Sequence, residues 1–270
     1  MPPPPAVFKA PIPTEQLAFL NDYAGHSEKD LRKDKRFKNL RKLIAPRTEY
    51  HYGSDMSLAD ANDLVLDGDP LPVDIRDGRY VMIGTHGGPY LSGRGFLWFD
   101  IQSGIGIGGV YFHPTNGEPT PTLAIYSSQL TDTYLSMGQL PEPFIHDLAQ
   151  WILVSGVRYV SPRYFIPENG KKYVLVHDED YCAHPPNTPA PPQDQCQQLN
   201  AEAADADMNA AYFMQQTHNQ ANATAWMLGP DQVAWLSVRD RSCGLGLACR
   251  IHITRERTRV LTGGGGGRRR

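Results

Sequence analysis

A histidine and a glutamate on one short loop are the first residues whose spacing could support chemistry. His113 directly precedes the turn at 114–121 and Glu118 lies within it. Such a pair can act as general base and general acid. The sequence has, however, no Gly-x-Ser-x-Gly elbow, no His-Glu-x-x-His pair and no phosphate-binding glycine loop. We therefore predict no catalytic residue. We interpret 114–121 as a turn or a recognition loop, with candidate contacts at His113, Asn116 and Glu118.

Four cysteines form the second set of chemically capable residues, and all of them lie in the last third of the chain. Neither pair has Cys-x-x-Cys spacing and no His-x-x-x-His follows, so we predict no metal site, and nothing indicates a cofactor. An even number of cysteines in a short polar region indicates disulfide bonds, which form in the periplasm or outside the cell. The four residues are Cys182, Cys196, Cys243 and Cys249.

The composition limits the class of protein further. The chain has 270 residues, 40% of them hydrophobic. Its 25 glycines and 23 prolines make up a smaller fraction of the chain than in low-complexity disordered or fibrous proteins. No apolar run is long enough to span a membrane. The net charge of −3 argues against a dedicated nucleic-acid-binding protein. No signal peptide is visible, so we interpret the chain as a mature form with a flexible or added tail at 263–270.

Residues 14–177 are predicted to form an α+β domain in which helices flank an antiparallel sheet. Four runs of alternating apolar residues are separated by turn residues, which is typical of an antiparallel meander. A helix follows from about 144 and ends near Gly156, because apolar residues recur there at three- and four-residue spacing. The predicted strands cover 79–84, 95–101, 106–112, 121–127, 157–166 and 171–177.

A basic amphipathic segment precedes the predicted sheet. Ser27 is a suitable N-cap, and apolar residues recur along one side as far as Ile44, so we expect one helix over 27–44. The other side carries eight lysines and arginines. These residues could bind an anionic polymer or simply face solvent, and we favour the solvated face.

The chain changes character after residue 178. Residues 178–195 are Pro-rich and are interpreted as a linker, whereas 196–262 show the spacing of a helical module. We expect the first helix to stop and the second to start at Gly229-Pro230, and a third helix to begin near 248. A unit of this size buries little apolar surface, so disulfide bonds are expected to support it.

The pairing of the cysteines stays open at this point. If the first two helices run antiparallel, Cys196 at the start of the first lies near Cys243 at the end of the second. We then expect each of Cys182 and Cys196 to bond to one of Cys243 and Cys249. The alternative joins Cys182 to Cys196 and Cys243 to Cys249, and the sequence does not exclude it.

The helical module carries a fairly specific combination of residues at fixed spacing. Its second helix has a glutamine, a tryptophan, an Arg-Asp pair and a cysteine, and its first has an Asp-x-Asn-x-x-Tyr run. In these residues the region from about 180 to 262 resembles the LprI-type lysozyme inhibitor family, whereas 1–178 cannot be assigned to a family. The matching residues are Asp207, Asn209, Tyr212, Gln232, Trp235, Arg239, Asp240, Cys243, Cys249, Thr254, Arg257, Thr258 and Leu261.

The resemblance implies an exported helical module that binds and blocks lysozyme. We interpret the module-defining side chains as structural: Trp235 fills the seam between the helices, and Arg239 hydrogen-bonds the facing helix at Asp205 or Asn209. The hypothesis is therefore an exported binding protein, of inhibitor or immunity type, whose partner is a lysozyme or another peptidoglycan hydrolase. The alternatives are a cell-envelope enzyme with its site in 14–177 and an envelope structural protein.

Acidic residues are the candidate contacts with such a partner, because lysozymes are frequently basic. Between 178 and 261 the chain has ten acidic and six basic residues, and the acids are concentrated in the linker and the first helix. Local negative charge accelerates association with a basic enzyme. The candidate contacts are Asp178, Glu179, Asp180, Asp205 and Asp207, with the turn at 114–121 as a second region.

Overall fold

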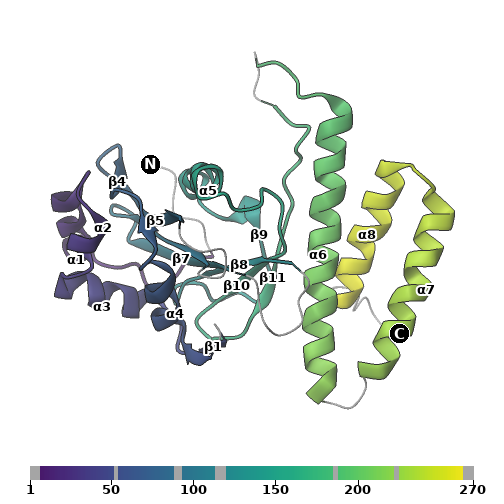
Figure 1. Cartoon of the computed structure of the whole chain (residues 1–270), viewed down its shortest axis with the longest axis horizontal. Helices are drawn as coiled ribbons and strands as arrows, with labels where there is room; N and C mark the ends of the chain where they lie inside the picture. Colours follow the sequence, from purple (N-terminus) through teal and green to yellow (C-terminus); the bar gives the residue numbers. More distant parts are fainter. Residues whose placement is uncertain are drawn as a thin grey trace. The chain divides into compact units, whose positions relative to one another are not determined.

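The chain divides into two compact units in the computed structural model, which describes residues 7–51, 54–87, 93–112, 120–184, 188–221 and 225–263 (Figure 1). The N-terminal unit comprises Met1–Tyr159 and Tyr164–Tyr173, and the C-terminal unit comprises Val160–Arg163 and Val174–Arg270. The first combines a sheet with helices and the second is built on three helices, so the predicted α+β class is confirmed. The predicted loop contacts His113, Asn116 and Glu118 lie outside the described residues.

Short helices lead into the sheet of the N-terminal unit. The hairpin of β1 and β2 lies between the third and the fourth of these α-helices along the chain. The elements are α1 (Thr14–Leu17), η1 (Ala18–Tyr23), α2 (Glu28–Leu31), α3 (Lys35–Ile44), β1 (Glu49–His51), β2 (Asp55–Ser57) and α4 (Leu58–Val65).

The single helix predicted over 27–44 is wrong, because a second cap divides it. Ser27 does cap the first turn, where its side chain accepts a hydrogen bond from the backbone nitrogen of Lys29. Asp34 then has extended backbone and accepts a hydrogen bond from the backbone nitrogen of Arg36. An aspartate in this role starts a new helix, so α3 begins at Lys35.

The sheet contains the predicted antiparallel meander, which consists of β5 (Tyr80–Gly87), β6 (Arg94–Asp100), β7 (Ile105–Phe112) and β8 (Thr122–Tyr126). Its register places Gly84 opposite Phe96, and Phe96 opposite Gly109. Two short strands pair with the outer side of β5. The full order is β3-β5-β6-β7-β8-β10-β11-β9, with β4 also on β5; these strands are β3 (Asp69–Pro70), β4 (Asp74–Arg76), β9 (Leu135–Ser136), β10 (Arg163–Ile166) and β11 (Tyr173–Val176).

Helices cover both faces of the meander (Figure 1). On one face α5 (Glu142–Ser155) packs so closely that a Cβ atom at Gly84 would lie 2.9 Å from the indole of Trp151. On the other face α3 brings Ile44 against Gly106. The strands are therefore buried on both sides, which is why they are almost continuously apolar. As predicted, α5 ends at Gly156, whose φ of 64° is left-handed.

Three helices form the C-terminal unit: α6 (Gln193–Ala221), α7 (Ala225–Cys243) and α8 (Leu247–Leu261). Alanines predominate on the buried side of α6, with Ala203, Ala206 and Ala210 at the predicted three- and four-residue spacing. In Figure 1, α8 lies between α6 and α7, and it packs chiefly against α6. No helix among the described residues is long and apolar enough to cross a membrane.

The helix boundary predicted at Gly229-Pro230 is wrong. Helix α6 ends at Ala221 and α7 begins at Ala225, so both residues lie inside α7. A proline within a helix removes a backbone hydrogen bond. This loss falls in the second turn of a 19-residue helix, and the helix continues past it.

Both predicted disulfide bonds are present, but they pair in the alternative way. Cys182 bonds to Cys196 and Cys243 bonds to Cys249, with Cα atoms 4.9 and 5.4 Å apart. Our preferred pairing is therefore wrong. Both pairs do lie toward the same end of the unit, where Cys182, Cys196 and the start of α8 surround one hollow, but each cysteine bonds to the partner nearer in sequence, 14 and 6 residues away.

Candidate partner-binding site

One of the predicted acidic contacts is an internal structural residue. Asp207, on α6, is 2% exposed, and its Oδ1 lies 2.6 Å from Nδ1 of the buried His177. Its Oδ2 accepts a second hydrogen bond from the backbone nitrogen of His177 at 2.9 Å. The interpretation of Asp207 as a contact residue is corrected accordingly, because a carboxylate enclosed in this way does not reach a partner.

The acids at 178–180 combine structural roles with exposure. Glu179 accepts a hydrogen bond from the buried Arg163 at 2.8 Å. Asp180 accepts hydrogen bonds from the side chain of Asn200 on α6 and from the backbone nitrogen of Cys182, and the Asn200 bond lowers the pKa of its carboxyl below the usual value. Asp178 and Asp180 remain exposed, so both present negative charge to solvent.

Arg239, on α7, joins all three helices from a buried position. It is 5% exposed, and its Nη1 donates to Asp205 on α6 at 2.9 Å and to Thr254 on α8 at 3.3 Å. Its Nε donates to the neighbouring Asp240 at 3.1 Å. Asp205, one of the two partners suggested by the sequence, is thus engaged within the unit, although its side chain stays 44% exposed.

A second polar cluster lies further along the same helices. Arg257, on α8, donates to the side chains of Gln232 and Asp231 on α7, and Gln232 in turn contacts the sulfur of Met208 on α6. Trp235 lies between the two guanidinium groups, 5.3 Å from Arg239 and 5.6 Å from Arg257. It is half-buried, so it covers this cluster and does not fill the seam as predicted.

The remaining module-defining residues divide between support and exposure. The hydroxyl of Tyr212 accepts a hydrogen bond from Gln216 within α6. Asp240 is an exposed partner of Arg239, and its Oδ1 also lies 3.6 Å from Nη2 of Arg250. Asn209 is exposed on α6. Most of the residues that define the module therefore hold its helices together, and its binding surface must be sought elsewhere.

Among the described residues of the C-terminal unit, the most exposed large apolar side chain lies in the turn between α7 and α8. Leu245 is 93% exposed, and the Cys243–Cys249 bond closes the turn around it. Gly244 takes a left-handed φ of 53°, and the backbone nitrogen of Gly246 donates to the carbonyl of Cys243 at 2.9 Å. This turn holds an apolar side chain in water at a fixed position, which folding alone does not require.

A hollow of about 470 Å³ opens at the same end of the unit. The Cys182–Cys196 bond forms one wall, and the first turn of α8, just after the Leu245 turn, forms another. Asp180 lies on the rim and brings negative charge. The lining residues are Asp180, Cys182, Ala190, Pro191, Gln193, Cys196, Gln197, Asn200, Ala248 and Ile251.

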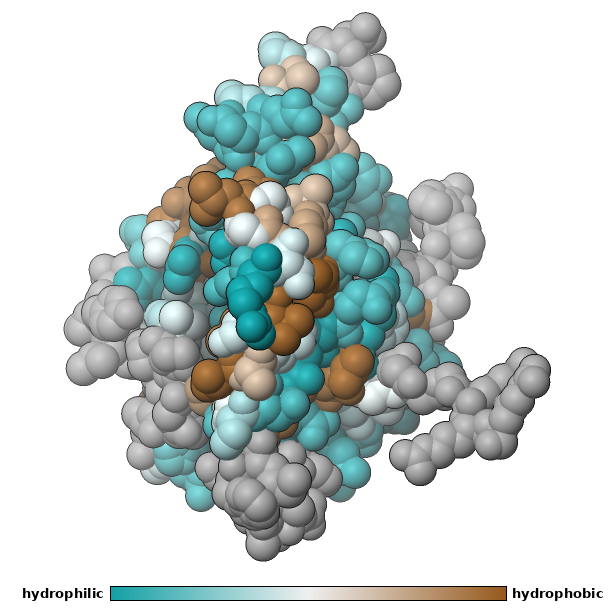
Figure 2. Space-filling model, turned by 90° about the vertical axis from the view of Figure 1, so that its right-hand side faces the viewer, coloured by the Kyte–Doolittle hydropathy of each residue, from teal (hydrophilic) through white to brown (hydrophobic). Residues whose placement is uncertain are grey.

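Elsewhere on the C-terminal unit the exposed apolar residues are less prominent. Val233, Val238 and Val260 are between 51% and 64% exposed. Figure 2, which looks onto the side that carries α7, shows brown hydrophobic residues interspersed with teal hydrophilic ones. Leu245 and the adjoining hollow are therefore the strongest candidates for a docking point, and a Gly-Leu-Gly sequence between two cysteines was the signal that could have identified the turn.

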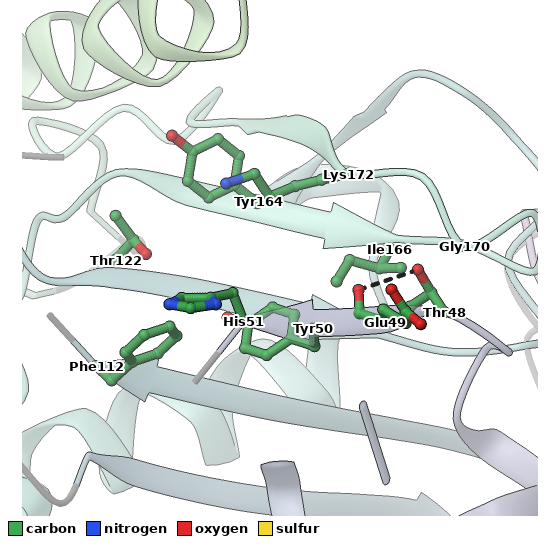
Figure 3. A pocket seen from close by; sticks show the side chains of 10 residues that line it. All are labelled: Thr48, Glu49, Tyr50, His51, Phe112, Thr122, Tyr164, Ile166, Gly170 and Lys172. Carbon is green, nitrogen blue, oxygen red and sulfur yellow. Dashed lines mark hydrogen bonds between the residues drawn. The ribbon is translucent and has the colours of Figure 1, made fainter. Parts of the chain in front are cut away.

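The N-terminal unit contains a pocket that sequence reasoning missed (Figure 3). Its volume is about 300 Å³, and it brings Glu49 and His51 of β1 together with Lys172. The Nδ1 of His51 lies 2.9 Å from Asp55, and the ammonium group of Lys172 lies 4.1 Å from the ring centroid of Tyr164. No serine or cysteine is among the described lining residues, so the pocket has acid-base groups without a nucleophile of those types.

The comparisons with known proteins concern the C-terminal unit. Residues 185–261 match the family described as lysozyme inhibitor LprI, which confirms the resemblance expected for the C-terminal third. The match covers α6, α7, α8 and the Leu245 turn, and it leaves the N-terminal unit outside. Neither a curated protein nor a solved structure matches the chain.

Proposed function

We propose that this protein binds a lysozyme or another peptidoglycan-cleaving enzyme and inhibits it through the disulfide-bearing end of the C-terminal unit. The observation that carries the proposal is that the lysozyme-inhibitor family match coincides with the unit that holds Leu245 on a closed turn. We name this surface the disulfide-bearing end and define it as the Leu245 turn with the adjoining hollow.

The geometry of this end suits the obstruction of an enzyme cleft. An enzyme that cleaves a polymer needs a long open cleft, and a protruding apolar side chain can enter such a cleft. The disulfide bond and the backbone hydrogen bonds restrict the Leu245 turn before binding, so little conformational entropy is lost on association. A protruding aliphatic side chain can serve as the central anchor of an interface when it fills a pocket on the partner.

Charge supports the choice of partner. Asp178 and Asp180 are exposed in the segment that leads to the hollow, and the hydrogen bond from Asn200 lowers the pKa of the Asp180 carboxyl. These charges attract a basic enzyme and raise the association rate, and added salt weakens the effect. The family match and two disulfide bonds are consistent with an extracytoplasmic protein, and we propose the periplasm or the cell exterior, where such enzymes act.

A pair of matched variants tests the proposed surface. Leu245→Asp places a charge on the fully exposed turn, and we expect it to weaken inhibition of a susceptible lysozyme at least tenfold. Val260→Asp is the control, because Val260 is also exposed, at 62%, but lies about 20 Å further along α8. Equal inhibition by both variants and the unmodified protein would place the contact surface elsewhere, and circular dichroism would verify that both variants are folded.

The second candidate function is an enzyme whose site is the pocket of the N-terminal unit. The specific observation in its favour is the histidine held by a carboxylate, His51 with Asp55, beside Lys172 in that pocket. The two functions predict opposite results with purified protein and cell-wall material. An enzyme releases soluble fragments unaided and loses this activity in His51→Ala, whereas an inhibitor releases none and slows an added lysozyme.

A further inference from the structure

A larger cavity, of about 550 Å³, lies between α5 and the extended segment 71–76 of the N-terminal unit. Five residues on one face of α5 form one wall, and strand β5 contributes Met82 and Gly84. Apolar side chains from all these elements line most of it. They include Leu71, Val73, Ile75, Met82, Trp151 and Val154.

The walls of this cavity are fixed by hydrogen bonds. The indole Nε1 of Trp151 donates to the carbonyl of Thr85 at 3.0 Å, and its ring rests on Gly84. The backbone nitrogen of Leu71 donates to the carbonyl of Gly84 at 2.8 Å. Val73 exchanges backbone hydrogen bonds with the 25–26 segment at 2.9 and 3.0 Å. A cavity with such walls exists before a ligand arrives, as is usual for small-molecule sites.

The arginine of the cavity wall is fully engaged by its neighbours. Arg76 donates through Nε and Nη2 to the two carboxylate oxygens of Asp147 at 3.0 and 3.2 Å, and Nη2 also donates to the carbonyl of Pro143. Asp147 is 7% exposed and accepts a further hydrogen bond from Trp98 at 2.9 Å. The positive charge of Arg76 is therefore neutralised within the wall and is not offered to a ligand.

The polar groups left at the rim include one carboxylate that has no described ion pair. Asp74 and Gln150 are exposed there, and the first carries a negative charge. His146 uses Nδ1 toward Asp147 at 3.0 Å, which leaves Nε2 for other partners. A ligand that enters the apolar part thus meets a carboxylate at the mouth, which attracts a cationic head group and repels an anionic one.

We propose that this cavity binds a small amphiphile with an aliphatic body and a positively charged amino head. The body displaces water from Met82, Val154 and the other apolar walls, and the ammonium group pairs with Asp74 at the rim. Affinity rises about fourfold for each added methylene until the cavity is filled. The site lies outside the residues that match the family, so it does not rest on the inhibitor proposal.

Three ligands with one chain length and different head groups test this assignment in the full chain. Isothermal titration of octylamine, octanol and octanoate is expected to give affinities in that order, with octylamine at least tenfold tighter than octanoate. Asp74→Asn is expected to bring octylamine down to the level of octanol and to leave octanol unchanged. Tightest binding by octanoate, or no binding of octylamine at millimolar concentration, would overturn the proposal.

Substitutions at two neighbouring residues of α5 test whether the ligand binds in this cavity. Val154 lines the cavity and is 54% exposed, whereas Leu153 is 67% exposed and does not line it. Val154→Arg is expected to weaken octylamine binding at least tenfold, because it fills the cavity and adds a like charge. Leu153→Arg is expected to bind as the unmodified protein does. Equal losses in both variants would show adsorption to the surface and would overturn the assignment.

Discussion

The two units of this chain achieve stability by different means. In the N-terminal unit the buried side chains are large and apolar, and Trp98, Trp151 and Phe96 are each at most 2% exposed. In the C-terminal unit α6 buries alanines, and polar groups such as Arg239 and Asp207 are enclosed between the helices. Both disulfide bonds belong to the second unit. Three helices with small contact residues bury too little apolar surface, so cross-links and polar networks hold them together.

Two buried carboxyl groups, one in each unit, are held in different ways. Asp207 of the C-terminal unit accepts hydrogen bonds on both oxygens. Glu28 of the N-terminal unit is 0% exposed, and neither of its oxygens accepts a hydrogen bond from a described residue. The nearest cation is Arg32, whose Nε lies 3.9 Å away. Asp207 therefore connects two segments, whereas Glu28 is buried at a cost, and it differs in this from Asp147 of its own unit, which accepts hydrogen bonds from Arg76 and Trp98.

Removal of the disulfide bonds is expected to cause the largest difference in stability between the two units. The two bridges close loops with sequence separations of 14 and 6, which together stabilise the C-terminal unit by about 5 kcal/mol. We expect reduction to abolish hydrogen-exchange protection in α6–α8 and to leave β5–β8 protected. Simultaneous loss in both regions would show one cooperative core and would contradict the prediction that 14–177 form a domain with a core of its own.

The second prediction concerns Glu28, where burial raises the pKa to about 7 from an ordinary value near 4.5. Arg32 and Arg41 oppose this shift, and Asp63 and Asp67 add to it. The carboxyl of Glu28 ionises at a lower pH in the unfolded chain than in the folded protein. The free energy of unfolding therefore falls by about 3 kcal/mol as the pH rises from 4.5 to about 7. Below them both states are protonated, and above them both are ionised.

Glu28→Gln tests this prediction, because the amide does not titrate. The stability of the unmodified protein relative to the variant should decline from pH 4.5 to 7 and stay level on either side. Urea denaturation at a series of pH values measures this difference, and other titrating groups cancel. A difference that stays flat across the range would show that Glu28 is ionised in the folded protein without penalty.

The smallest loss of stability is expected when one arginine is removed from the polar network of the C-terminal unit. Arg239→Met removes hydrogen bonds to Asp205 and Thr254 and should destabilise the unit by about 2 kcal/mol, with inhibition retained under folding conditions. Arg241→Met is the control, since Arg241 is exposed and, within the described part of the chain, donates locally to the carbonyl of Ser237, so little change in the denaturation midpoint is expected. Normal stability with lost inhibition in Arg239→Met would make Arg239 a contact residue.

The sequence predicts the elements that depend on local pattern. The meander of β5–β8 and the end of α5 at Gly156 follow from alternation, turn residues and a left-handed glycine. Errors arise where a competing local interaction is equally possible. Asp34 caps a new helix although the amphipathic pattern continues through it, and α7 accommodates Pro230 for the loss of one hydrogen bond.

The site is less predictable because distant segments build it. The burial of Asp207 depends on His177, 30 residues earlier, and the spacing of the four cysteines leaves both the local pairing that is present and a pairing across the helices open. Arg239 is an exception to this, because the sequence already suggests that it hydrogen-bonds the facing helix at Asp205 or Asn209, and it donates to Asp205. The pockets of the N-terminal unit draw on several separate segments, and no short motif marks them.

Titration of several lysozyme types with the intact, oxidised protein tests the central claim most directly. The rate of bacterial wall lysis is measured against inhibitor concentration, with calorimetry on the same samples to give stoichiometry. We expect at least one lysozyme type to be inhibited at micromolar or lower concentration, with one protein bound per enzyme and weaker binding as salt is added. The absence of both inhibition and binding for every type at micromolar concentration would contradict the account.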